Sequence, residues 1–129
     1  MSLKVPAALL ERAEQGDATD ADFIACIKES LPYAWEVVST LVERTSETGA
    51  SYADDQTPPP SQEEHGQLLR AMASDAMRNA LEQHFGVRVA FQNCCRVGVF
   101  TADAGDEAYR DFVSPRAQLL NQSPELINC

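Results

Sequence analysis

Hydrophobic residues recur at helical spacing over the first two thirds of the chain. The predicted helices cover about residues 6–15, 20–30, 31–45 and 61–85. Thr19 with Asp22, and Ser61 with Glu64, have the spacing of a capping box, which marks the start of a helix. The last segment is the longest periodic run and is rich in good helix formers. We therefore predict one long central helix over residues 61–85.

The hydrophobic period changes from about four to two over residues 87–100. A three-residue connection would pair Phe91 with Val97 and Val89 with Val99, which places these apolar side chains on one face. A two-residue connection would spoil this alternation. The sequence therefore predicts an antiparallel hairpin with an odd-length loop.

Two other stretches lack a clear period. Residues 46–60 contain glycine, several acids and three consecutive prolines, and we interpret them as an exposed loop. Residues 104–127 carry scattered apolar positions and two Ser-Pro breaks, which predict a C-terminal helical tail. Residues 1–129 are thus expected to form a single α+β domain, mostly helical, with the long helix packed on a small antiparallel β-hairpin or sheet.

Charge narrows the possible functions. The chain has 129 residues, with ten basic and twenty acidic side chains and a net charge of −10. This balance argues against general nucleic-acid binding and against binding to anionic membranes. No apolar run approaches the length of a transmembrane helix, and the first residues do not resemble a signal peptide.

The four cysteines are Cys26, Cys94, Cys95 and Cys129. Cys26 lies in the apolar stripe of a predicted helix, and Cys94 and Cys95 are adjacent at the predicted hairpin tip. Secreted disulfide frameworks space their cysteines along shorter, loop-rich chains. We therefore expect a cytoplasmic protein with free thiols.

Cys94 is the candidate for nucleophilic catalysis, because Arg96 lies close to it in sequence. A reactive thiol needs a lowered pKa, which a histidine, a cation or a helix N-terminus can provide. His84 is ten residues earlier and would lie near the far end of the strand, too distant for a Cys–His pair. We favour the interpretation that the cysteine pair belongs to an ordinary loop.

Cys94, Cys95 and His84 also supply the ligand types of a metal site. Their spacing matches no zinc pattern. His65 and His84 would lie more than about 25 Å apart on one straight helix. We therefore expect no metal and no cofactor.

The outer face of the predicted hairpin carries Arg88, Gln92 and Arg96. An arginine fork on such a face can bind a carboxylate, a phosphate or another protein surface. The alternative is that these side chains only keep an exposed strand face soluble. As exposed groups, the two arginines could be replaced by alanine with folding nearly intact.

Four segments of the sequence carry a resemblance to a known family: residues 30–36 (SLPYAWE), 55–60 (DQTPPP), 90–94 (AFQNC) and 118–126 (QLLNQSPEL). The chain resembles an uncharacterised family of small acidic cytosolic proteins from Streptomyces and related actinobacteria. The resemblance implies a bacterial cytosolic protein and transfers no catalytic residue.

Two functional hypotheses follow. The favoured one is a non-enzymatic interaction or regulatory protein, a homodimer that binds an unknown protein partner through Arg88, Gln92, Arg96 and the loop at 46–60. The alternative is a small enzyme or ligand-binding protein, with a pocket between the long helix and the hairpin that uses Arg88, Arg96 or Cys94. The absence of a phosphate-binding loop and of any converging acid, base and nucleophile favours the first hypothesis.

Overall fold

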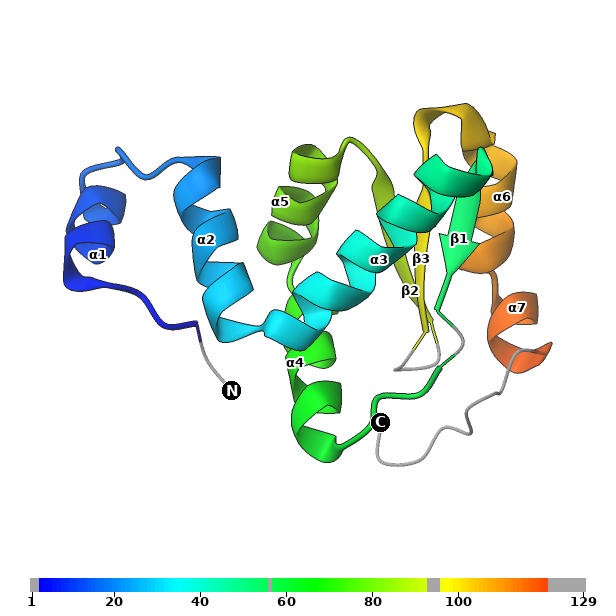
Figure 1. Cartoon of the computed structure of the whole chain (residues 1–129), viewed down its shortest axis with the longest axis horizontal. Coiled ribbons are helices and arrows are strands. Elements are labelled where there is room, and N and C mark those ends of the chain that lie inside the picture. The colour runs from blue at the N-terminus through cyan, green and yellow to red at the C-terminus, as the bar shows by residue number, and fades with distance from the viewer. Residues whose placement is uncertain (1–2, 56, 93–95, 121–129) are drawn as a thin grey trace.

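The computed structural model describes residues 3–55, 57–92 and 96–120. In chain order the elements are α1 (Ala7–Glu14), α2 (Asp20–Ser30), α3 (Pro32–Thr48), β1 (Tyr52–Asp54), α4 (Gln62–Met72), α5 (Asp75–Phe85), β2 (Arg88–Gln92), β3 (Arg96–Phe100), the 3₁₀ helix η1 (Ala102–Ala104), α6 (Gly105–Phe112) and α7 (Pro115–Leu120) (Figure 1). The fold is α+β and mostly helical, as predicted.

The sheet has three antiparallel strands in the order β1-β3-β2. Phe91 pairs with Val97 and Val89 with Val99, so the predicted register is confirmed. The predicted loop tip, with Cys94, lies outside the described residues. The inner face of the sheet packs against the helices in one core, whose largest fully buried apolar side chains include Ile27, Leu31, Leu41, Leu68, Met72, Leu81, Val89, Val97 and Val99.

The single long helix predicted over residues 61–85 is wrong, because the structure has two helices there. The α-helix ends at Met72, and the Ser74 hydroxyl accepts a hydrogen bond from the Met77 amide (3.3 Å) to cap a new helix. The break lets α4 pack on α3 while α5 packs on α2 (Figure 1). The hydrophobic period runs through the break because both helices bury one face in the same core.

The exposed loop predicted over residues 46–60 is only partly correct. Helix α3 continues to Thr48 and ends at Gly49, whose φ of 71° is the left-handed conformation that glycine adopts most easily. Three of the following residues form β1, which pairs with β3, and the Asp55 amide donates to the Val97 carbonyl (2.8 Å). This strand is too short to show a hydrophobic period, so only its pairing partner reveals it.

Helix α6 covers the outer face of the sheet. The Phe100 ring contacts the rings of Tyr109 and Phe112 edge to face, with centroids 5.6 and 5.5 Å apart. Gly98 leaves the room that the Phe112 ring needs, because a Cβ at this position would lie 2.9 Å from Phe112 Cζ. The predicted C-terminal tail is therefore, up to Leu120, a pair of helices beside the sheet.

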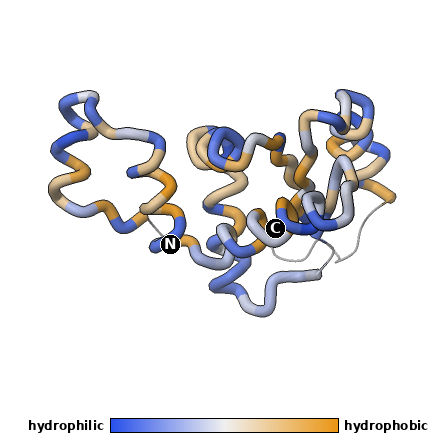
Figure 2. The backbone as a smooth tube through the Cα atoms, turned by 45° about the horizontal axis from the view of Figure 1, so that its top comes forward, coloured by the Kyte–Doolittle hydropathy of each residue, from blue (hydrophilic) through white to orange (hydrophobic). Residues whose placement is uncertain are grey.

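At the opposite end of the molecule, α1 buries none of its residues (Figure 1). Hydrophilic and hydrophobic stretches alternate along the helices, as expected of helices that bury one face (Figure 2). None of the helices in the described part of the chain has the length and apolarity needed to cross a membrane.

Candidate functional site

Two clefts flank α6. A cleft of ≈ 620 Å³ lies between α5, the start of β2 and α6, and its lining includes Arg88. A groove of ≈ 610 Å³ lies between β1, the other end of the hairpin and α7, and its lining includes Gln92 and Arg96. The three predicted site residues are therefore not on one continuous surface, because α6 lies between them.

Arg88 lies in the first cleft and holds α6 in place. Its guanidinium lies 3.6 Å from the centroid of the Tyr109 ring and donates to the Asp106 carboxylate (3.1 Å). Across the cleft, the Glu82 carboxylate accepts a hydrogen bond from the Val89 amide (2.8 Å). About half of the Arg88 side chain (49 %) is exposed, so the prediction of an exposed arginine holds here.

Arg96 is a correction to the sequence prediction, because it is not an exposed residue. Its side chain is only 10 % exposed, and its Nε donates to Asp54 Oδ2 (3.0 Å). Gln92 is also buried, and its side-chain amide donates to the Phe112 carbonyl. The ion pair joins β1, the strand that the sequence did not predict, to the central strand β3. The strand face around Arg96, which was expected to be exposed to solvent, is therefore enclosed.

The residues that sequence reasoning missed at this groove come from three separate elements: Tyr52 and Asp54 from β1, Phe112 from α6 and Arg116 from α7. The apolar side of α6 was recognisable from its sequence. Its docking on Gly98 was not, because a glycine in a strand has several explanations.

The thiol and imidazole groups do not converge on either cleft within the described residues. Cys26 is a free, buried cysteine of α2, and burial raises the pKa of its thiol, with a smaller contribution from the negative charges of Glu29 and Asp22. The His84 ring packs against the rings of Trp35 and Phe85, with centroids 5.3 and 4.8 Å apart. A buried thiol with a raised pKa is a poor nucleophile.

The metal-site candidates Cys94 and Cys95 lie outside the described residues, as does Cys129. Residues 3–55, 57–92 and 96–120 contain no group of three or more His, Cys, Asp or Glu side chains that could hold a metal ion. The two histidines lie on different helices, His65 on α4 and His84 on α5, so the separation expected for one straight helix does not apply.

Comparison with known proteins identifies a family. A family model, KH_NucS_shadow, described as NucS shadow ORF, matches residues 1–129. Neither a curated protein nor a solved structure matches the chain. Since the match spans the whole chain, this protein belongs to the NucS shadow ORF family.

Proposed function

We propose that this protein is a non-enzymatic binding protein that holds a protein partner on the outer face of its sheet, in the groove between β1 and α7. The observation that carries the proposal is Arg96, which is nearly buried yet lines an open groove. A charged side chain fixed in this way is positioned for recognition, because the energetic cost of ordering it is met before the partner arrives.

The rim of the groove also supports a protein partner. Tyr52 and Leu120 line it and are 46 % and 64 % exposed. Exposed aromatic and aliphatic side chains around a fixed arginine are the composition that protein interfaces favour. As expected from the sequence, we also propose that the protein is cytoplasmic and comes from an actinobacterium.

Charge argues against nucleic acid as the partner. The net charge of −10 opposes contact with phosphates. The letters KH in the family name also denote a nucleic-acid-binding module, whose G-x-x-G loop clamps the backbone. The sequence of this chain contains no G-x-x-G.

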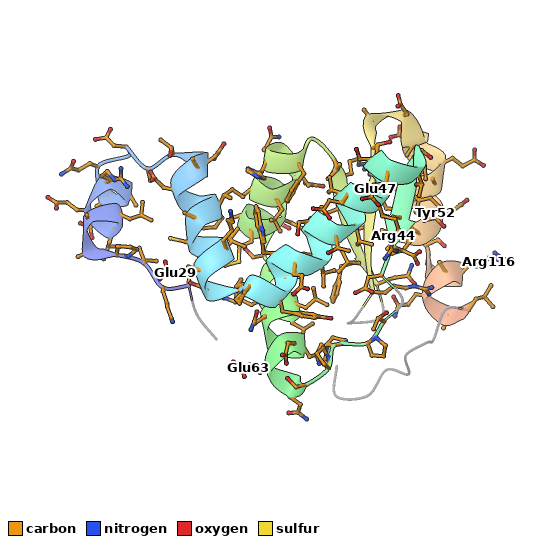
Figure 3. All side chains as sticks on the ribbon, viewed as in Figure 1. Glu29, Arg44, Glu47, Tyr52, Glu63 and Arg116 are labelled. Atoms are coloured by element: carbon orange, nitrogen blue, oxygen red, sulfur yellow. The ribbon has the colours of Figure 1, made fainter. Side chains whose placement is uncertain are left out.

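Photo-crosslinking in cells tests the proposal. The photoreactive amino acid p-benzoylphenylalanine replaces Tyr52 or Arg116 at the groove, or, as the matched control, Glu63 on α4 (Figure 3). All three side chains are exposed, and the control lies away from α7. The family description, NucS shadow ORF, names this reading frame together with NucS. The variants are therefore expressed from a separate gene copy, so that the substitutions leave the original locus unchanged.

We expect both groove positions to give an adduct with the same protein, identified by mass spectrometry, and the control position to give none. Equal adducts at all three positions, or no adduct at the groove, would overturn the proposed function.

We further propose that the protein is a homodimer. The sheet has β1 and β2 at its edges, and pairing an edge strand with its copy across a two-fold axis satisfies free backbone groups. Light scattering on the purified protein is expected to give twice the chain mass of 14.1 kDa. A particle of the chain mass at micromolar concentration would contradict the dimer.

A further inference from the structure

The groove between β1 and α7 contains an arginine with only one edge of its guanidinium in use. A guanidinium offers two edges to acceptors, one with Nε and one with the two terminal nitrogens. In Arg96 the Nε donates to Asp54 Oδ2 (3.0 Å). Among the described residues, no acceptor is hydrogen-bonded to Nη1 or Nη2 of this arginine.

Burial makes the unused edge significant. The Arg96 side chain is nine-tenths buried and lines the groove of ≈ 610 Å³. In the described part of the chain these terminal nitrogens are not among the buried polar atoms that lack a partner, so they face the solvent of the groove while packing holds the rest of the side chain. An arginine on a fully exposed side chain would lose conformational freedom on binding, whereas Arg96 already holds these donors in one orientation.

We propose that the groove binds a carboxylate that carries an apolar body, and that the carboxylate is held end-on by Nη1 and Nη2 of Arg96. The inference rests on the proposed binding role of the same groove and names the chemical group that is recognised there. Two nearly parallel N–H donors match the two oxygens of a carboxylate, which gives both strength and orientation.

The other charged groups of the groove are compatible with an anion. Arg116 adds a second positive charge on α7 and is exposed, whereas Asp54 and Asp111 add two negative charges. Asp54 is already paired with Arg96 through Nε. Asp111 is exposed, so solvent and salt screen its repulsion.

The walls of the groove define the rest of the ligand. Phe112, Ala117 and Leu120 provide apolar surface beside the polar end at Arg96. The volume lies within the range of small-molecule sites, about 300–1,000 Å³. An apolar body next to a carboxylate occurs both in a free organic acid and in the C-terminal residue of a peptide, so both sources share this chemistry.

Side-chain NMR of the purified protein tests the inference. The Nε–H resonance of each arginine is followed while benzoate, or a short peptide that ends in leucine with a free carboxylate, is added at millimolar concentration. Benzamide and the same peptide with a C-terminal amide are the controls, because they keep the apolar body and lack the charge. We expect the Arg96 resonance to shift with the acids and to stay unchanged with the amides.

Two variants locate the carboxylate. Arg96→Lys keeps the charge and loses the two-pronged edge, so the affinity is expected to fall about 10- to 100-fold. Arg88→Lys, in the other cleft, is the matched control and is expected to bind as the wild type does. Because Arg96→Lys could disturb the fold, Arg116→Glu provides a second variant on an exposed position, and we expect it to weaken binding about two- to fivefold.

A shift with the peptide alone assigns a peptide terminus, as a protein partner would supply. A shift with benzoate alone assigns a small organic acid and counts against a protein partner in this groove. No shift of Arg96 with either acid, or equal shifts with acids and amides, would overturn the inference. The proposed function would survive that result if crosslinks still formed at the groove, and it would fail independently if they did not.

Discussion

Arg88 and Arg96 show how the surroundings of a residue determine what its charge contributes. Arg88 is half exposed, and solvent screens its pair with Asp106. Arg96 and Asp54 are 10 % and 17 % exposed, so solvent compensates little of either charge. Removing one member of such a pair is costly, because the other charge loses its counter-ion in a largely enclosed position.

The first prediction concerns these two arginines. Arg96→Ala is expected to lower the free energy of unfolding by about 3–5 kcal/mol, because the largely enclosed Asp54 carboxylate loses the cation of its ion pair. Arg88→Ala is expected to lower it by about 1 kcal/mol, since its contacts are exposed. Urea denaturation measures both values. The double variant Arg96→Gln with Asp54→Asn is the control, and it is expected to be more stable than Arg96→Ala.

Equal losses of unfolding free energy in Arg96→Ala and Arg88→Ala would contradict the conclusion that Arg96 is buried and Arg88 is exposed. The burial of Arg96 also changes the expectation from the sequence that both arginines could be replaced by alanine with folding nearly intact.

The second prediction concerns two glycines. Gly98→Ala places a Cβ 2.9 Å from Phe112 Cζ and 3.1 Å from Phe100 Cε1, so the ring that anchors α6 must move. We expect a loss of about 1–3 kcal/mol in the free energy of unfolding. Gly66→Ala, at an open position within α4, is expected to raise it by about 0.5–1 kcal/mol, because alanine favours the helix.

Thermal and urea unfolding measure the change in the free energy of unfolding of the two glycine variants. The two changes are expected to have opposite signs if α6 packs on the sheet as described. A neutral Gly98→Ala substitution would show that Phe112 is not in contact with this strand.

At the scale of elements, helix starts follow from short-range chemistry. Thr19 and Asp22 form the predicted capping box of α2: the Thr19 hydroxyl accepts from the Asp22 amide (3.2 Å), and the Asp22 carboxylate accepts from the Thr19 amide (3.0 Å). Ser61 caps α4 at the predicted position. These interactions span three residues, so sequence spacing alone reveals them.

The third prediction is the pH dependence of this cap. The hydrogen bond from the Thr19 amide, followed by that from its hydroxyl and the charge of Arg12, lowers the pKa of Asp22 below its ordinary value. A depressed carboxyl pKa stabilises the folded protein above the unfolded-state pKa of about 3.9 and loses that contribution as the pH falls through the folded-state pKa. Acidification is therefore expected to loosen the start of α2.

NMR of the Asp22 carboxyl carbon measures this pKa, and amide exchange at the start of α2 measures the loosening. In Asp22→Asn the acid-induced step is expected to disappear, whereas the control Asp17→Asn, outside the helix, is expected to keep it. An Asp22 pKa at or above the ordinary value would contradict the prediction.

At the scale of the whole molecule, burial falls from the sheet towards the N-terminal helix. All five residues of β3 are buried, whereas every residue of α1 except Leu9 is exposed. The described contacts that tie the α1 region to the body include the Arg12–Asp22 pair (3.0 Å) and the hydrogen bond from the Lys4 amide to the Ser30 hydroxyl (2.6 Å). Local stability follows buried contacts, so it is expected to be lowest in α1.

The fourth prediction is the resulting exchange pattern. In hydrogen–deuterium exchange, the amides of α1 are expected to exchange fastest among the helices, and those of β3 and α3 slowest. An eight-residue helix without tertiary support is marginal in water, which is the physical reason. Equal protection of α1 and β3 would show that α1 is held by contacts other than those described.

The sequence by itself determined the features that depend on local interactions, or on apolar side chains that recur along one face of a helix or strand. The α+β class and the pairing of Phe91 with Val97 follow from spacing, because a helix repeats near four residues and a strand near two. The capping box of α2 and the Ser61 cap of α4 follow from short-range hydrogen bonds. Arg88 and Arg96 were also identified as the notable charges of the hairpin from the sequence.

Only the tertiary structure decided what surrounds those charges. The three-residue β1 and the seating of Phe112 on Gly98 depend on partners distant in sequence, and no local pattern encodes them. The Asp54–Arg96 pair joins residues 42 positions apart. Packing decides whether a charge is buried, because a side chain loses its water only when distant segments of the chain come together around it. For the same reason the groove between β1 and α7 exists only in the folded chain.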